Sequence, residues 1–396
     1  MRLSDEDRIP RDRDDDYAPE VIARRRAFVE HRTGARLAHV GGAPFDPALA
    51  RGNVEHFTGV AQVPLGFAGP LCVDGEHARG DFFVPMATTE GTLLASYGRG
   101  MRLTRAIGGV RTTVVADAMQ RAPVFGFDDA RGALAFTTWV DAHKPEIARA
   151  AQATTKTGVL VGIERYVAAH FAYLRFNYTT GDAAGQNLTS KATDAACRYI
   201  HATYDGGAPI RAFTLSGAMD TDKKASFINT LNTRGKRVVA EVTIPEAAML
   251  EHLHVTGKAL FAARLRSTLG AWMAGSTNNG SHAANALAAI FIATGQDVAN
   301  LAESHVAVVY TDLLADGSLY YSITLPSLIV ATYGGGTGLP TQRECLDTLG
   351  CYGSGKVRKF AEIVAATVLC GELSLGAAVV AGEWVDAHER LGRNRP

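Results

Sequence analysis

The sequence predicts an α+β protein with one larger and one smaller folded unit. Three observations support this fold class. The chain has 396 residues, a length typical of two or three domains. Residues 123–212 combine strand-like alternation with helical periodicity, and we expect them to form a separate α+β unit. Residues 272–300 are apolar nearly all round, as is typical of a helix buried inside a domain.

The N-terminal part is expected to be irregular at first and then helical. Residues 1–16 carry mixed charges without an apolar core, so we expect a disordered tail. Residues 17–52 are expected to be a helical segment, with a helix at 19–31 because Pro19 lies in its first turn and Gly34 follows its end. The next residues, 53–90, are rich in Gly and Pro and suit strands and tight loops.

The remaining elements follow in chain order. In the smaller unit we expect a strand at 135–140, a helix at 145–153, a strand at 171–180 and, after a glycine-bearing loop, a helix that ends near Tyr204. In the larger unit we expect a strand at 238–244, the buried helix at 272–300, a hairpin of strands 306–314 and 319–325 around Asp316-Gly317, and helices over 357–391.

The composition argues against several classes of function. The 40 basic and 40 acidic side chains cancel, and no basic patch interleaved with aromatics indicates a nucleic-acid partner. The five cysteines are scattered, which argues against a disulfide framework or a zinc site and favours a reducing compartment. The longest apolar stretch, 365–381, is interrupted by Glu372 and predicts a buried helix pair rather than a membrane span. We therefore expect a cytoplasmic protein that uses neither a metal nor a membrane.

The most informative short motif is Asp222-Lys223-Lys224. It lies in a stretch otherwise made of small and apolar residues. Burying an ammonium group is costly unless it is paired, and Asp222 supplies a counter-charge. One use of such a lysine is to hold a cation where a carbonyl oxygen becomes negative during a reaction. The alternative for the tripeptide alone is a solvated turn.

Three further polar residues, Glu90, Asp297 and His388, stand in largely apolar surroundings. Taken singly, they suit a helix cap, the polar end of a core helix and a surface histidine. Taken together with Lys223, they match the reduction of a thioester to an alcohol. Two carboxyl groups in one dry site do not both ionise cheaply, so one becomes an acid. A histidine protonates a departing thiolate near neutral pH.

Two glycine-rich segments invite nucleotide hypotheses. The loop 181–187 follows a strand and precedes a helix, a geometry that places phosphate at a helix N-terminus. It is not the Gly-x-Gly-x-x-Gly pattern of a Rossmann unit. The segment 350–357 matches a P-loop until Val357 replaces the Ser or Thr that binds magnesium. We expect a flexible turn there, and a nucleoside triphosphatase remains an alternative.

Several motifs, in this order, resemble the hydroxymethylglutaryl-CoA reductase family, specifically its soluble, class I-like catalytic domain. The resemblance covers the chain from about residue 20 to its end. The matching segments are Val63-Pro64-Leu65-Gly66-Phe67-Ala68-Gly69-Pro70-Leu71, residues 86–91, residues 181–187, Asp222-Lys223-Lys224, Ser281-His282-Ala283-Ala284-Asn285, Gly295-Gln296-Asp297, Gly334-Gly335-Gly336-Thr337 and Gly371-Glu372-Leu373-Ser374-Leu375.

The resemblance implies a domain arrangement. A large substrate-binding and catalytic domain, formed by residues 53–122 and 213–396, surrounds a long buried central helix at 272–300. A ferredoxin-like α+β domain that binds NADP(H), residues 123–212, is inserted into it. The partners implied are a CoA thioester and a second copy of the chain, in a homodimer or a dimer of dimers with active sites at the subunit interface.

The resemblance also implies roles for individual residues. Lys223 stabilises the oxyanion, Glu90 donates a proton in the second reduction, Asp297 tunes both, and His388 protonates the CoA thiolate. The residues implied to bind substrate are Arg121, Ser216, Asp222, Lys224, Arg266 and Asn285. The residues implied to bind cofactor are Lys156, Asp182, Ala183, Gly185, Gln186, Asn187, Gly335, Gly336 and Thr337.

The implied activity is the NADPH-dependent reduction of hydroxymethylglutaryl-CoA to mevalonate and CoA by two hydride transfers. Several residues depart from the family pattern, among them Arg266, which replaces a lysine, and Ala218 and Gly98, which each replace an asparagine. Arginine and lysine are not interchangeable in a tight site. The alternative is therefore a reductase of the same fold that acts on another acyl-CoA thioester in a specialised pathway. Lys156 keeps a positive charge for NADPH.

Overall fold

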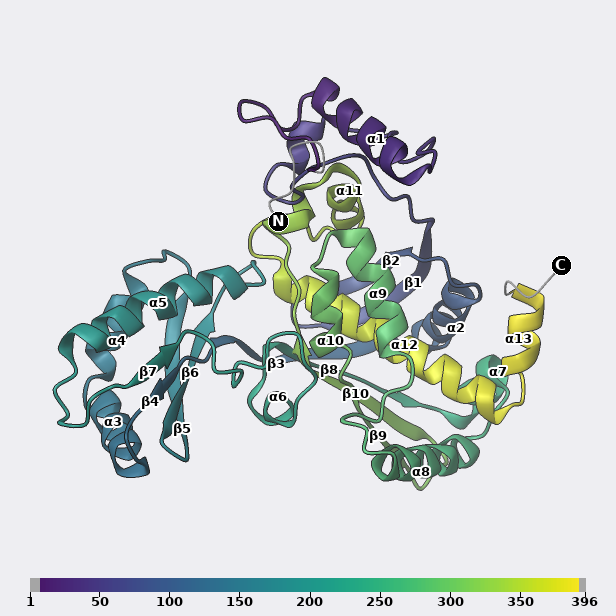
Figure 1. Cartoon of the computed structure of the whole chain (residues 1–396). Coiled ribbons are helices and arrows are strands. Elements are labelled where there is room, and N and C mark those ends of the chain that lie inside the picture. Colours follow the sequence, from purple (N-terminus) through teal and green to yellow (C-terminus); the bar gives the residue numbers. More distant parts are fainter. Residues whose placement is uncertain (1–7, 392–396) are drawn as a thin grey trace.

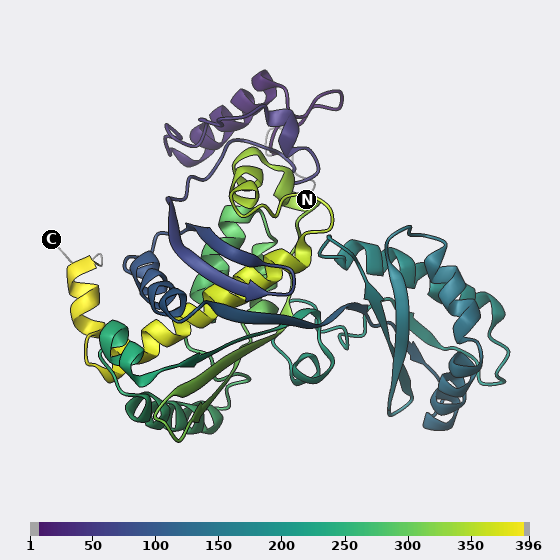
Figure 2. The same cartoon turned by 180° about the vertical axis from the view of Figure 1, so that it is seen from behind.

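The computed structural model describes residues 8–391, which form two bodies that share one sheet (Figures 1 and 2). The main strand order of this sheet is β7-β4-β6-β3-β8-β10-β9. Strand β3 (Val110–Arg121) belongs to both bodies. It pairs with β8 through residues 111–118 and with β6 through residues 119–121. The backbone hydrogen-bond ladder therefore runs from one body into the other.

The larger body contains the β8-β10-β9 end of this sheet, the β1–β2 pair and most of the helices. Its strands besides β3 are β1 (Leu65–Gly75), β2 (Arg79–Ala87), β8 (Gly235–Ile244), β9 (Val308–Leu313) and β10 (Leu319–Leu328). Its helices are α2 (Leu93–Ala106), α6 (Phe227–Asn232), α7 (Glu246–Leu253), α8 (Gly257–Met273), α9 (Ala283–Thr294), α10 (Leu301–Ser304), α11 (Pro340–Thr348), α12 (Val357–Val380) and α13 (Trp384–Leu391), with short 3-10 turns η3 (Val298–Asn300) and η4 (Gly335–Gly338). The expected strand at 238–244 and the hairpin around Asp316-Gly317 are confirmed.

The long central helix is α12, and the expectation of a buried helix over 272–300 was wrong. Helix α12 has 24 residues, 18 of them buried, and runs through the middle of the larger body (Figure 1). Residues 272–300 instead hold the end of α8, a loop, helix α9 and η3. The chain breaks at Gly275, whose φ of 71° is left-handed, and at the polar run that follows. Small apolar residues on both sides hid this break in the sequence pattern.

Glu372 does not split α12 into the pair of helices that the sequence predicted over 365–381. Its Oε1 accepts hydrogen bonds from the backbone N–H groups of Ser281 (2.7 Å) and His282 (2.6 Å) at the start of α9. Burial raises the pKa of the Glu372 carboxyl, against these hydrogen bonds, which lower it. Helix α12 is long and apolar enough to cross a membrane, but 72% of its most apolar window is buried inside the protein, as in a core helix.

The smaller body has its own apolar core. It contains β4 (Val124–Gly126), α3 (Ala130–Ala142), α4 (Lys144–Gln152), β5 (Val159–Ala168), β6 (Phe171–Thr179), α5 (Gln186–Thr203) and β7 (Ala212–Thr214). The expected helix at 145–153, strand at 171–180 and helix before Tyr204 are confirmed. The strand expected at 135–140 was wrong, because α3 covers it: Asp129 caps the helix, and Ala133, Phe136 and Val140 are buried at helical spacing.

The N-terminal segment contains α1 (Pro19–Thr33) and η2 (Pro47–Ala50), which share a small apolar cluster of Ile22, Ala50 and Phe57 (Figure 1). The expected helix is confirmed, and Gly34 ends it with a φ of 74°. Arg25 is fully buried and donates to the carbonyl oxygens of Pro10 (2.8 Å) and Phe57 (2.9 Å). Residues 10–16 are thus held against α1, in contrast to the disorder expected over 1–16. Residues 1–7 of that expected tail lie outside the described chain.

Helices α2 and α12 approach closely at Gly100, which yields a prediction. A Cβ atom on Gly100 would lie 1.9 Å from the carbonyl oxygen of Cys370. We expect Gly100→Ala to push the helices apart and lower the free energy of unfolding by roughly 1–3 kcal/mol. Chemical denaturation measures this change.

Gly98 on the same helix provides the matched control. A Cβ atom there meets only the Arg102 guanidinium, at 3.9 Å. Gly98→Ala should leave the free energy of unfolding unchanged or raise it by up to about 1 kcal/mol, because alanine favours a helix. Equal losses in the two variants would contradict the close approach of α2 to α12.

Candidate active site

Lys223 lies in a loop, residues 215–226, whose backbone is strained. Three non-glycine residues of this loop have left-handed φ angles: Ala218 (66°), Thr221 (55°) and Lys223 (57°). Such conformations cost of order 1 kcal/mol each and persist only where the surroundings fix them. They cluster at functional sites. The loop therefore needs strong contacts to keep its shape.

A buried ion pair supplies those contacts. Arg234 Nε and Glu303 Oε2 are 2.6 Å apart, and both side chains are fully buried. Glu303 Oε1 accepts the backbone N–H of Lys223 at 2.6 Å. Arg234 Nη2 also donates to Asp222 Oδ1 at 2.8 Å. Burial raises the pKa of the Glu303 carboxyl, although the positive charge of Arg234 acts to lower it.

The structure brings Lys223 and Asp297 together, as the sequence motifs suggested. Lys223 Nζ lies 3.1 Å from Asp297 Oδ2, and both side chains are slightly less than half exposed. Asp297 is placed by the end of α9, where Gly295 has a φ of 68°, and by its own cap on the Ala299 N–H (3.0 Å). A Cβ at position 295 would lie 2.3 Å from Gly336 O, so glycine is required there.

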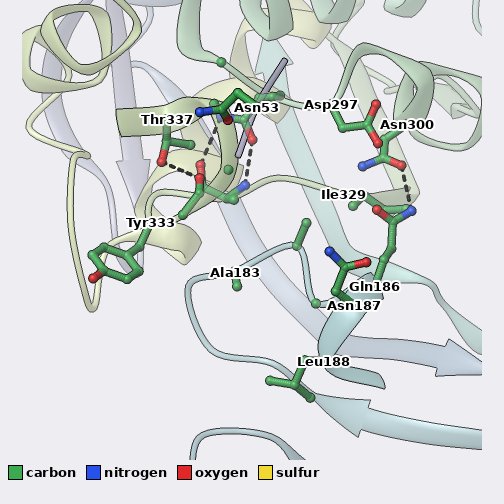
Figure 3. Close-up of a pocket in the computed structure, with 18 of the residues that line it drawn as sticks. Asn53, Ala183, Gln186, Asn187, Leu188, Asp297, Asn300, Ile329, Tyr333 and Thr337 are labelled. Atoms are coloured by element: carbon green, nitrogen blue, oxygen red, sulfur yellow. Dashed lines mark hydrogen bonds between the residues drawn. The ribbon is translucent and has the colours of Figure 1, made fainter. Parts of the chain in front are cut away.

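The Lys223–Asp297 pair lines a cavity of about 820 Å³ together with the glycine-bearing loop before α5 (Figure 3). Gln186 Nε2 donates to Asp222 Oδ1 and to Asn300 Oδ1, each at 2.9 Å, and so links this loop to the lysine loop. The first backbone N–H groups of α5 suit an anion. The predicted cofactor residues that line the cavity are Ala183, Gly185, Gln186, Asn187, Gly335, Gly336 and Thr337.

Asp182 and Lys156 do not line this cavity. Lys156 is exposed between α4 and β5. The Asp182 carboxylate instead accepts hydrogen bonds from the backbone N–H groups of Gly355 (2.7 Å), Lys356 (3.0 Å) and Val357 (3.2 Å). Burial acts to raise the pKa of this carboxyl, but these hydrogen bonds outweigh it, and the pKa lies below its ordinary value. The P-loop-like segment therefore holds a carboxylate of its own chain at the start of α12.

Glu90 lies in a second cavity, of about 480 Å³, with Asn285 and residues of α13. Asn285 Nδ2 is 3.4 Å from Glu90 Oε1. Asn285 is near the start of α9, whereas Asp297 follows its end, and the 12 residues of α9 span about 18 Å. Glu90 and Lys223 thus lie at opposite ends of α9 within one chain. His388 belongs to α13, but its side chain lies outside the described part of the structure.

The residues expected to bind the substrate are placed in several ways. Arg121 and Ser216 both contact Asp220, a residue that the sequence reasoning missed. Its signal in the sequence was a second acidic residue in the lysine loop, two positions before Asp222. Lys224 Nζ donates to Asp222 O at 3.1 Å. Arg266 is exposed on α8 and lines neither cavity.

Comparisons with known proteins agree on one family. The family model described as hydroxymethylglutaryl-coenzyme A reductase matches residues 21–393. Enzymes named 3-hydroxy-3-methylglutaryl-coenzyme A reductase from Methanocaldococcus jannaschii and Aeropyrum pernix are 40% and 42% identical, over 93% and 95% of this chain and 92% and 90% of theirs. A class II enzyme of that name from Streptococcus pneumoniae, solved with NADPH, has a similar fold: TM-score 0.67, 20% identity, 84% of this chain and 89% of that one.

The Asp182 contacts yield a pH-dependent prediction. A carboxyl whose pKa is lowered on folding stabilises the protein above its unfolded pKa, and this contribution is lost as pH falls through the folded pKa. At pH 6 we expect Asp182→Asn to lower the free energy of unfolding by about 2 kcal/mol. This difference from the unmodified protein should shrink below pH 4, roughly the ordinary pKa of an aspartate. Denaturant titrations from pH 6 to pH 3 measure it.

Asp194→Asn is the control for that titration, because Asp194 pairs with Arg198 on the surface of α5. Surface pairs contribute less than about 1 kcal/mol. A pH-independent loss in Asp182→Asn would contradict the role of the charged carboxylate at the start of α12.

Proposed function

The chain belongs to the hydroxymethylglutaryl-coenzyme A reductase family, and we propose on this premise that it reduces hydroxymethylglutaryl-CoA to mevalonate and CoA with two NADPH. The observation that carries the proposal is the Lys223–Asp297 pair, 3.1 Å apart beside a cavity that the glycine-bearing loop also lines. A cation paired with a carboxylate at the rim of a large cavity suits a reaction in which a carbonyl oxygen becomes negative.

NADPH, when bound, supplies one hydride for each of the two reductions. The 820 Å³ cavity suits such a ligand, because Gly335 and Gly336 present backbone without side chains and the first N–H groups of α5 favour a phosphate. Asn187 and Thr337 add polar groups on the two sides of the cavity. We assign Lys156 to the 2′-phosphate on its charge alone. We propose that Asp182 holds the glycine-bearing loop in place through its hydrogen bonds to residues 355–357 and does not contact the cofactor directly.

Lys223 is the proposed electrophilic group. Its ammonium polarises the thioester carbonyl and then stabilises the oxyanion of the hemithioacetal. Asp297, 3.1 Å away, holds that ammonium in place. The hydrogen bond from the Lys223 backbone N–H to Glu303 fixes the position from which the lysine side chain extends toward the carbonyl.

Glu90 and His388 are the proposed proton donors, for the second reduction and for the CoA thiolate respectively. Because Glu90 and Lys223 line different cavities of one chain, we propose that the complete site forms between two copies. One copy then contributes the Lys223–Asp297 end of α9, and the other contributes Glu90, Asn285 and α13. The molecule would be a cytoplasmic homodimer or a dimer of dimers.

We propose that residues 123–212 are a ferredoxin-like, inserted domain that binds NADPH, and that residues 53–122 and 213–396 bind the CoA thioester. Residues Arg121, Ser216, Asp222, Lys224 and Asn285 are proposed around the acyl group, with Arg266 at the far end of the substrate. Nucleotide hydrolysis at residues 350–356 is not proposed, because the Asp182 carboxylate already accepts the hydrogen bonds of the Gly355 and Lys356 backbone N–H groups that a phosphate would need.

Removal of the lysine charge tests the central role of Lys223. We expect Lys223→Met to lower kcat for NADPH oxidation with hydroxymethylglutaryl-CoA by about 10²–10³-fold or more, with the fold unchanged. Loss of absorbance at 340 nm, the ordinary assay for NADPH, measures the rate. Lys258→Met, a change at an exposed lysine of α8, is the matched control and should keep the original rate. A Lys223→Met enzyme with near-normal kcat would refute the proposal.

Mixing two inactive variants tests the shared site. Lys223→Met and Glu90→Gln chains are co-expressed with different tags, and mixed dimers are isolated. If each site combines Lys223 of one copy with Glu90 of the other, a mixed dimer holds one intact site and shows about half the activity of the original dimer. If each chain contains a complete site, mixed dimers stay inactive, which would count against the shared arrangement.

A further inference from the structure

Asp220 is a buried carboxylate that contacts Arg121, a residue that lines the 820 Å³ cavity. Its side chain is only 1% exposed, and its Oδ2 lies 2.7 Å from Arg121 Nη1. Ser216 Oγ donates to the same carboxylate, at 3.0 Å from Oδ2 and 3.3 Å from Oδ1. Asp220 and Ser216, from the loop that also carries Lys223, thus form one cluster with Arg121 at the end of β3.

Arg121 connects this cluster to the 820 Å³ cavity. Arg121 lines the same cavity as Lys223 and Asp297. Its side chain is 13% exposed, and its Nε is buried without a hydrogen-bond partner among the described residues. A buried donor without a partner is costly, so the contact with Asp220 leaves the hydrogen-bonding capacity of this guanidinium incompletely satisfied.

The cations that line this cavity already have anionic partners, and Asp222, which also lines it, pairs with Arg234. The cavity lining includes two cationic residues, Arg121 and Lys223, among the residues that the structure describes, and each has a carboxylate of the chain beside it. A carboxylate that arrives on a ligand must share Arg121 with Asp220, and two carboxylates in one buried site repel each other. An uncharged acyl group meets no such repulsion.

We propose that Asp220 is a specificity-determining residue: an internal carboxylate that competes with the distal carboxylate of an acyl-CoA for Arg121 and Ser216. This inference rests on the proposed function, the reduction of a CoA thioester. Relative to a site with a free Arg121, the chain should therefore discriminate against thioesters that carry a distal carboxylate, while thioesters with an uncharged acyl end are unaffected. Arg266, proposed above at the far end of the substrate, lines neither described cavity of one chain and is not part of this cluster.

The test compares two thioesters that differ in one carboxylate, hydroxymethylglutaryl-CoA and 3-hydroxy-3-methylbutanoyl-CoA. Asp220→Asn keeps the shape of the side chain and removes its charge. We expect it to lower KM for hydroxymethylglutaryl-CoA about tenfold, with kcat nearly unchanged. KM for the uncharged thioester should stay the same. A KM that rises for both substrates, or falls equally for both, would overturn the proposal.

Asp117→Asn is the matched control. Asp117 is a mostly buried carboxylate on β3, the strand that also carries Arg121. It pairs with the buried Lys236 at 3.2 Å and does not line the cavity. It should leave the ratio of the two KM values unchanged. A shift in this ratio as large as that in Asp220→Asn would mean that any lost buried carboxylate has the effect, and would refute a specific role of Asp220.

A binding measurement separates this proposal from the proposed function. Calorimetric titration with free 3-hydroxy-3-methylglutarate needs no turnover, and Asp220→Asn should bind it about tenfold more tightly than the unmodified protein. If neither thioester is reduced, the proposed function fails while the titration still tests Asp220. If Asp220→Asn does not fold, Asp220→Ser, which keeps a hydroxyl for Arg121, replaces it in the same titration. Equal or weaker binding in the folded variant sinks the proposal.

Discussion

The buried ion pair between Arg234 and Glu303 is the interaction on which the candidate site depends. Its two members contact the lysine loop at different points: Glu303 binds the backbone of Lys223, and Arg234 binds the side chain of Asp222. Arg234 Nη1 also donates to the Gln120 carbonyl on β3, at 2.9 Å. Breaking a buried pair by removing one partner typically costs about 3–5 kcal/mol, because the other charge is left buried. The Arg234–Glu303 pair therefore anchors the strained loop to the sheet, and its disruption would be energetically costly.

Helix α12 organises the larger body through two buried glutamates ten residues apart in its sequence. Glu372 accepts the backbone N–H groups at the start of α9, and Glu362 accepts those of His77 (2.9 Å) and Ala78 (2.6 Å) in the β1–β2 turn. In both cases a carboxylate replaces the water that exposed backbone groups would bind. One helix thereby fixes both a turn of the sheet and the helix α9, whose two ends carry Asn285 and the segment with Asp297.

The sequence predicted the local elements better than the long-range ones. Helix α1, strand β6 and the β9–β10 hairpin follow from periodicity and turn residues that lie close together in the chain. The central helix was misplaced because 272–300 and 357–380 are both rich in small apolar residues, and only packing distinguishes them. The Lys223–Asp297 pair could be expected from its motif. The Asp220–Arg121 pair could not, because its members are 99 positions apart and each alone is an ordinary surface residue type.

The passage of β3 from one body to the other has a mechanical consequence. Between Ala118 and Met119 its pairing changes from β8 to β6, and Gln120 ties the two sides by donating to Asn177 Oδ1 and Thr233 O. Arg175, fully buried, adds a bond from β6 to Asn229 of α6 at 3.0 Å. The two bodies are therefore joined by a twisted, hydrogen-bonded sheet and by side-chain contacts on both sides of β3, not by a flexible linker. We expect the smaller body to move relative to the larger one only through small rotations about the axis of β3.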